Sequence, residues 1–221
     1  NNHNVTPESV DLQRASGSSS ANYKNLIAYV KSHNLASAEH YDYVAERVDI
    51  DNYINYIVAE IIIGNNDNGN IRFYRSDEGD GKWRWIMYDV DQSFRGATEQ
   101  TVAAHLNPAG TGSEDRFPTS LINGLLKNAG FKEKFLRNIA WQLNEVWSAE
   151  KVGAKVDAFE AAIEADMRRD CEKWKLGYDG WRAQVQSLRD FAEKRPASIV
   201  SQVKSYFSLS DDQMRAYGFH L

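Results

Sequence analysis

The sequence predicts an α+β fold that is mostly α-helical, with seven or eight helices around one β-hairpin. Apolar residues recur every three to four positions over most of the chain, which is the period of helices that bury one face. Residues 71–75 and 82–90 differ, because they are rich in aromatic and β-branched residues and flank the polar stretch 76–81. That pattern is typical of two paired strands joined by a turn.

The composition excludes several classes of function. The 221 residues include 31 acidic and 26 basic side chains, a net charge of −5, which argues against a nucleic-acid binder that works by a basic face. No apolar run of about 18 residues is present, so no membrane span is predicted. Cys171 is the single cysteine, which excludes an intrachain disulfide and a cysteine-based zinc site. The start, Asn1 to Asn4, has the character of a cut inside a longer protein.

The N-terminal part is expected to form a polar arm followed by three helices. Residues 1–20 are polar and end in a Ser/Gly run, so we expect a loop or arm there. Asp49 or Asp51 is expected to cap the third helix, and Gly64 to end it. Helical spacing of apolar residues places these helices at residues 21–33, 37–48 and 51–63.

The centre of the predicted fold is the stretch 51–95, which gives a helix, a polar loop, a strand, a turn and a second strand. Asp67 lies in the loop before the first strand, and Asp89 lies at the end of the second. Because paired antiparallel strands run in opposite directions, these two ends meet. We therefore expect Asp67 and Asp89 at the same end of the hairpin. This arrangement suits phosphoryl transfer, which needs positioned carboxylates and divalent ions.

These carboxylates also have plainer interpretations. Asp, Asn and Gly are the ordinary residues of turns, so Asp67 can be a turn residue only. Asp89 and Asp91 would project from the same face of an extended strand, where they repel one another unless a cation lies between them. That cation is either a bound metal ion or one of the arginines Arg72, Arg84 and Arg95.

Two other features of the hairpin have alternative interpretations. The acidic stretch 77–80 resembles a loose calcium loop, but it lacks the terminal Glu of the full pattern, so a solvated turn is favoured. Trp83 and Trp85 alternate with Arg84 and could stack on a ligand, although packing beneath the helices is favoured.

The chain after the hairpin is expected to be a long loop and then helices. Residues 96–118 have weak periodicity, and loops of that length are either functional lids or surface loops. From Thr119 the pattern is helical, with a first helix that is expected to end near Gly130. Ser148 is expected to begin another helix.

Later helices are expected to break at two points. Gly177 to Gly180 interrupts the apolar pattern, and Pro196 is expected to kink or restart the chain because it cannot donate a backbone hydrogen bond. We place one domain at residues 21–210 and a C-terminal tail at 211–221.

The motifs of this sequence resemble those of the CotH kinases, which are atypical protein kinases named for spore coat protein H. The resemblance runs from about residue 20 to 210, and its specific part is central: residues 49–53, residues 66–75, and residues 85–91 with Phe94. A weaker resemblance in the C-terminal helices lies in Met167, Arg168, Arg169, Trp174, Trp181, Phe191 and Arg195.

The resemblance implies an atypical protein-kinase-like C-terminal lobe whose hairpin carries the metal-binding Asp. In it Asp67 matches the catalytic Asp, Asp89 the metal-binding Asp, and Asn70 the neighbouring metal-side Asn, with Asp91 as a second candidate ligand. The implied cofactor is ATP with Mg²⁺ or Mn²⁺, the implied partner is a protein that offers Ser or Thr hydroxyls, and the implied setting is bacterial, extracytoplasmic or spore-coat associated.

Two departures from the family support an alternative. The loop from Asp67 to Asn70 is shorter than is usual in the family, and we expect the family's N-terminal part, with its phosphate-contacting Lys, to be absent from this chain. The alternative is a non-catalytic binding or structural module built on a kinase-like scaffold.

Overall fold

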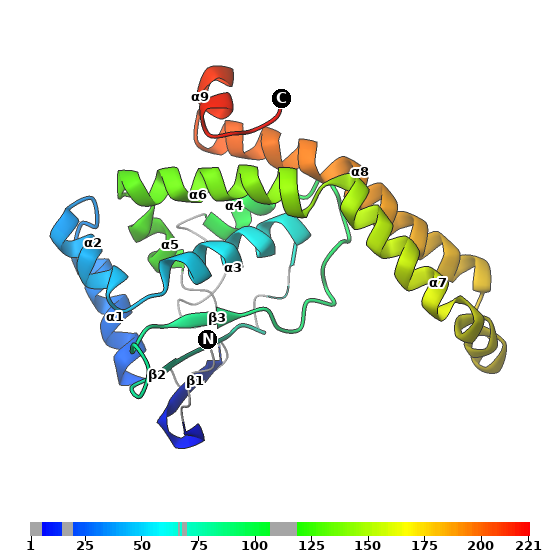
Figure 1. Cartoon of the computed structure of the whole chain (residues 1–221), viewed down its shortest axis with the longest axis horizontal. Helices are drawn as coiled ribbons and strands as arrows, with labels where there is room; N and C mark the ends of the chain where they lie inside the picture. Colours follow the sequence, from blue (N-terminus) through cyan, green and yellow to red (C-terminus); the bar gives the residue numbers. More distant parts are fainter. Residues whose placement is uncertain (1–5, 15–19, 66, 68–69, 107–118) are drawn as a thin grey trace. The chain divides into compact units, whose positions relative to one another are not determined.

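The computed structural model confirms an α+β fold that is mostly helical (Figure 1). The chain divides into two compact units: unit 1 comprises residues 1–93 and 101–139, and unit 2 comprises residues 94–100 and 140–221. No helix among the described residues is long and apolar enough to cross a membrane. The structure describes residues 6–14, 20–65, 67, 70–106 and 119–221.

Unit 1 contains an antiparallel sheet with the strand order β1-β2-β3. The predicted hairpin is present as β2 (Arg72–Ser76) and β3 (Arg84–Ile86), so the second strand is much shorter than the predicted 82–90. The first strand, β1 (Val10–Arg14), pairs along the whole of β2. The expectation of a loop or arm for residues 1–20 is therefore wrong for these five residues.

One face of this sheet carries an aromatic cluster. Phe73 lies opposite Trp85 in the β2–β3 register, and its ring lies 5.5 Å from those of both Trp83 and Trp85. Tyr23 from the first helix joins the cluster, 4.5 Å from Phe73. All four side chains are buried, so Trp83 and Trp85 are core residues, as favoured from the sequence.

The third helix of unit 1, α3 (Ile50–Ile63), supports the sheet by packing against β3. Its Asn52 side chain accepts a hydrogen bond from the Trp85 N–H (2.6 Å) and donates one to the Trp85 carbonyl (3.1 Å). Asp49, not Asp51, caps the helix by accepting from the Asn52 N–H. Gly64 ends it in the left-handed conformation (φ 69°), as predicted.

The described part of unit 1 contains five further α-helices. The predicted break between two helices is present at residues 126–128, but Gly130 is not the C-cap, because the Asn128 side chain accepts from the Phe131 N–H and so caps a new helix that already contains Gly130. The helices are α1 (Ala21–Ser32), α2 (Ala38–Ala45), α4 (Thr101–Leu106), α5 (Thr119–Leu125) and α6 (Ala129–Trp141), the last of which enters unit 2 at Ala140.

Unit 2 is built on two long antiparallel helices, α7 (Ala149–Trp174) and α8 (Tyr178–Tyr206), which follow a π-helical turn at Gln142–Val146 (Figure 1). The Ser148 side chain caps α7, as predicted. Arg189 of α8 reaches across to Asp157 and Glu160 of α7. A short helix, α9 (Asp211–Ala216), lies within the predicted tail.

A kink or a restart was expected at Pro196, and the restart is wrong, because α8 runs through this residue. Proline removes one backbone N–H donor from the helix. The burial of Phe191 before it and Ile199 after it in the sequence offsets this loss. Arg195 is buried as well and donates from Nη1 to the carbonyls of Ala97 (3.0 Å) and Glu99 (2.9 Å). Burial lowers the pKa of the Arg195 guanidinium to about 10, so it stays charged at neutral pH and ties residues 94–100 to α8.

Candidate functional site

The loop that carries Asp67 begins where α3 ends. After Gly64, the buried Asn65 side chain accepts a hydrogen bond from the Asp67 N–H through Oδ1 (3.0 Å). The Asp67 carbonyl in turn accepts from the Asn70 N–H (3.3 Å). These bonds are typical of a tight Asx turn, and they place Asp67 and Asn70 directly before β2. Asn66, Asn68 and Gly69 lie outside the described residues.

Three of the four predicted site residues meet at the end of the hairpin. The Asn70 side-chain amide donates from Nδ2 to Asp67 Oδ2 (2.9 Å) and to Asp89 Oδ2 (2.8 Å). The two carboxylates, 22 positions apart in the sequence, therefore share one donor. Two neighbouring carboxylates repel one another, and the amide hydrogens of Asn70 reduce this repulsion.

Asp89 takes up a backbone conformation that the sequence did not predict. The strand ends at Ile86, and Asp89 has φ 53°, in the left-handed region that few residues other than Gly, Asn and Asp enter readily. The expectation that Asp89 and Asp91 share one face of an extended strand is therefore wrong. Asp91 lies in a turn and accepts from the Gln92 side chain (3.1 Å). Sparsely populated conformations cluster at functional sites, which makes the one at Asp89 notable.

A buried carboxyl group lies beneath the Asp67 loop, and sequence reasoning missed its role. Glu60 of α3 is 4% exposed, and its carboxyl group accepts hydrogen bonds from the side chains of Asn65 and Tyr56. Burial raises the pKa of Glu60, and the same hydrogen bonds oppose that rise. Glu60 thus holds Asn65, and Asn65 holds the backbone of Asp67. The available signal was a lone acidic residue inside the apolar run from Ile57 to Ile63.

We expect the Glu60→Gln variant to be more stable than the wild type at pH 8 and similar to it near pH 4.5. Because the folded-state pKa of Glu60 is raised, the stability that its neutral form contributes is present below the ordinary value of 4.5 and is lost as pH rises through the folded value. Gln cannot ionise, so the gain at pH 8 should be of order 1 kcal/mol. Urea unfolding from pH 4.5 to 8.5 measures it. The exposed-site variant Glu46→Gln controls for one lost negative charge, and equal pH slopes for wild type and Glu60→Gln would contradict the expectation.

The arginines of the hairpin bear on one alternative that the sequence left open, the character of the acidic turn at residues 77–80. Arg84 pairs with Asp49 (2.9 Å) and Asp80 (2.6 Å), and it holds the pKa of Asp80 well below its ordinary value. Arg75 pairs with Asp77. Asp77 and Asp80 of the acidic turn are therefore paired with arginines of the sheet, as expected for a solvated turn. Arg84 is directed to that turn and not to Asp89.

Most of the chain matches one protein-family model. The family model described as CotH kinase protein matches residues 3–199 of the 221. The chain belongs to the CotH kinase family. Neither the curated proteins nor the solved structures gave a significant match. The family match begins before β1, so in this CotH chain the strand lies within the matched part.

The side chains of this CotH site are chemically suited to bind a divalent ion. Carboxylate and amide oxygens are the ligands that Mg²⁺ and Mn²⁺ prefer, and Asp89 and Asn70 supply one of each kind. Asp89 and Asn70 would hold the ion, which would offset the negative charge of the neighbouring carboxylates, and Asn70 would offer its Oδ1 in place of the amide hydrogens it now donates. Among the described residues, no three Asp, Glu, His or Cys side chains group together, so Asp91 does not complete a carboxylate triad.

The expectation of a loop over residues 96–118 is wrong for Thr101–Leu106, which form the helix α4 because Val102 and Leu106 are buried in the core. In this helix the Thr101 hydroxyl donates to the Ile61 carbonyl (2.7 Å) and so anchors the segment to α3. Residues 107–118 lie outside the described part of the chain. The prediction that this stretch takes the place of a kinase activation segment stays a prediction.

Proposed function

We propose that this CotH chain acts as an atypical protein kinase, which transfers the γ-phosphoryl group of ATP to Ser or Thr hydroxyls of a protein. Family membership supports the kinase class. The observation that carries the finer proposal is the shared donor: Asn70 bridges Asp67 and Asp89 at 2.9 and 2.8 Å. The three residues that the family resemblance singles out therefore form one hydrogen-bonded group.

Each residue of the group has a separate role in the proposal. Asp67 accepts the hydrogen bond of the acceptor hydroxyl and orients its oxygen towards the phosphoryl group. Asp89 and Asn70 hold Mg²⁺ or Mn²⁺. When bound, such an ion offsets negative charge on the nucleotide's phosphates. Phosphoryl transfer depends mainly on positioning and charge stabilisation, and these three residues supply groups suited to both tasks.

The supporting structure explains why Asp67 could be positioned accurately. Its N–H is fixed by Asn65, its side chain by Asn70, and Asn65 by the buried Glu60. A catalytic group is most effective when hydrogen bonds and packing lock it in place. In this account the Glu60 and Asn65 side chains are positioning residues and do not touch the substrate.

A phosphotransfer assay on the wild-type chain tests the proposal. The chain is incubated with γ-labelled ATP, Mg²⁺ or Mn²⁺ and an acceptor protein rich in Ser and Thr, and modified residues are located by mass spectrometry. The proposal expects metal-dependent label on Ser or Thr. No transfer from a folded chain would contradict it and would support the alternative, a binding module on a kinase-like scaffold.

A further inference from the structure

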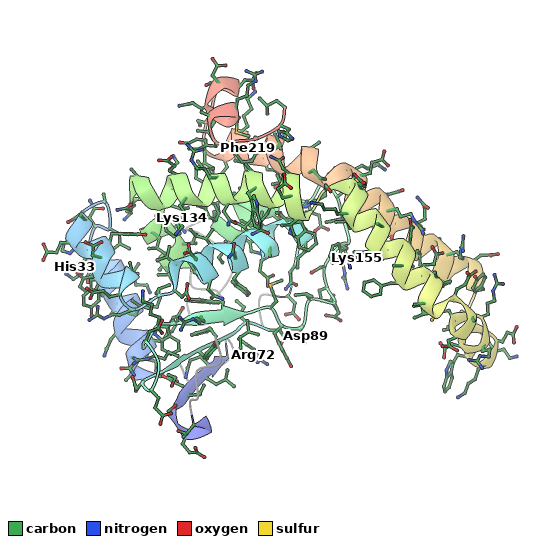
Figure 2. All side chains as sticks on the ribbon, viewed as in Figure 1. His33, Arg72, Asp89, Lys134, Lys155 and Phe219 are labelled. Atoms are coloured by element: carbon green, nitrogen blue, oxygen red, sulfur yellow. The ribbon has the colours of Figure 1, made fainter. Side chains whose placement is uncertain are left out.

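We propose that Arg72 is a phosphate-binding residue of this site, which holds the terminal phosphates of the nucleotide. The inference rests on the proposed function, and it adds an anion-binding group to the three residues already assigned. Arg72 lies in β2, two positions after Asn70, and opposite Ile86 in the sheet register. It therefore lies at the same end of the hairpin as Asp89, and Figure 2 labels both side chains.

The guanidinium of Arg72 is held in a defined place. Its central carbon lies 4.5 Å from the ring centroid of Tyr88, the residue directly before Asp89, and Nη1 donates to the Ile71 carbonyl (3.0 Å). Tyr88 is 46% exposed, so the stacked pair faces solvent and not the core. An arginine that is stacked on an aromatic ring keeps its remaining N–H donors available to a planar or tetrahedral anion.

Arg72 also differs from its neighbours in charge pairing. Among the arginine side chains described in unit 1, it is the one for which the structure shows no carboxylate partner. The others pair with acidic residues: Arg47 with Glu46, Arg75 with Asp77, Arg84 with Asp49 and Asp80, and Arg137 with Glu133.

The position of this cation at the same end of the hairpin as the two carboxylates points to one class of ligand. A metal-bound polyphosphate carries a divalent ion that carboxylates bind and several oxygens that a guanidinium binds, frequently in bidentate fashion. Arg72 on β2 and Asp89 in the segment that follows β3 offer these two kinds of contact at one end of the hairpin. A bare metal ion would not use Arg72, and a bare phosphate would be repelled by Asp67 and Asp89. The pairing therefore favours a nucleotide triphosphate with its ion.

Titration of the whole chain with MgATP and with magnesium tripolyphosphate tests the inference. The Arg72→Gln variant is expected to bind both about tenfold more weakly, the effect of losing a hydrogen bond between charged groups. The affinity of Arg72→Lys should lie between those of the wild type and Arg72→Gln, because Lys keeps the positive charge but loses the planar donor pair that binds phosphate in bidentate fashion. Arg75→Gln, on the opposite face of β2, is the matched control and should bind like the wild type. Thermal unfolding of each variant confirms that it is folded.

Several outcomes would overturn the inference. Tripolyphosphate binding that is equal in Arg72→Gln and wild type, or not measurable in wild type, removes the role of Arg72. A loss confined to MgATP assigns Arg72 to the nucleoside and not to the phosphates. The inference and the proposed function can fail separately. Phosphate binding that depends on Arg72 without any phosphotransfer contradicts only the function, whereas transfer with phosphate binding that is independent of Arg72 contradicts only the inference.

Discussion

The Asp67→Asn variant should lose phosphotransfer by about 10²- to 10⁴-fold in kcat, which is the usual contribution of a positioned general base. Asn has the same shape and can still accept from the Asn70 amide through its oxygen, but it cannot take the proton of a hydroxyl. Its affinity for MgATP should change little, because Asp89 and Asn70 hold the ion in the proposed mechanism. Steady-state kinetics with varied ATP separates kcat from KM.

A matched control uses the same substitution at another acidic residue of unit 1. Asp77→Asn alters an exposed carboxylate in the hairpin turn, where its partner is Arg75, and should leave kcat unchanged. An Asp67→Asn variant with kcat within about threefold of the wild type would remove Asp67 from the chemistry, since general bases contribute far more than this. A parallel loss in Asp77→Asn would indicate a general effect on the fold.

The second large effect is expected at Asp89. Asp89→Asn should weaken metal-dependent ATP binding by about 100-fold, because even outer-shell partners of a metal commonly contribute 10- to 100-fold and Asp89 is proposed as a direct ligand. Asn is preferable to Ala here, because the backbone at φ 53° tolerates Asn and strains Ala. Calorimetric titration with ATP at fixed Mg²⁺ or Mn²⁺ measures the loss.

Asp91→Asn is the natural companion of that variant. Asp91 was a predicted second ligand, yet its carboxylate contacts Gln92 and belongs to no carboxylate triad in the described part of the chain. We expect its substitution to leave ATP binding within about threefold of the wild type, as for most surface substitutions. Equal losses in the two variants would restore Asp91 as a ligand, and no loss in either would contradict the proposed metal site.

Much of the site was predictable because local rules govern it. Asp49 and Gly64 delimit α3 through capping chemistry that depends on a few neighbouring residues. The meeting of Asp67 and Asp89 follows from the opposite directions of two paired strands. The shared donor on Asn70 was not predictable in detail, because it depends on the turn at residues 65–70 and on the conformation of Asp89.

The features that escaped prediction depend on tertiary contacts. Strand β1 has an inverted pattern, with Leu12 53% exposed and Gln13 buried, so no apolar alternation marks it. The Gln13 Oε1 accepts from the Ser20 N–H (2.8 Å), which makes its burial tolerable. Glu60 and Pro196 violate the simplest rules for helix interiors, and only their surroundings explain them: a hydrogen-bonded network for Glu60 and buried packing for Pro196.

The central claim is that Asp89 and Asn70 hold a metal ion beside Asp67, and nuclear magnetic resonance with trace Mn²⁺ tests it without any need for activity. A bound paramagnetic ion broadens nearby signals. We predict selective broadening of the Asn70 side-chain amide, absent in Asp89→Asn. The side-chain amide of Asn34 should stay sharp, because its neighbour His33 is labelled at the far end of unit 1 from Asp89 (Figure 2). Uniform broadening, or an Asn70 signal that stays sharp, would contradict the account.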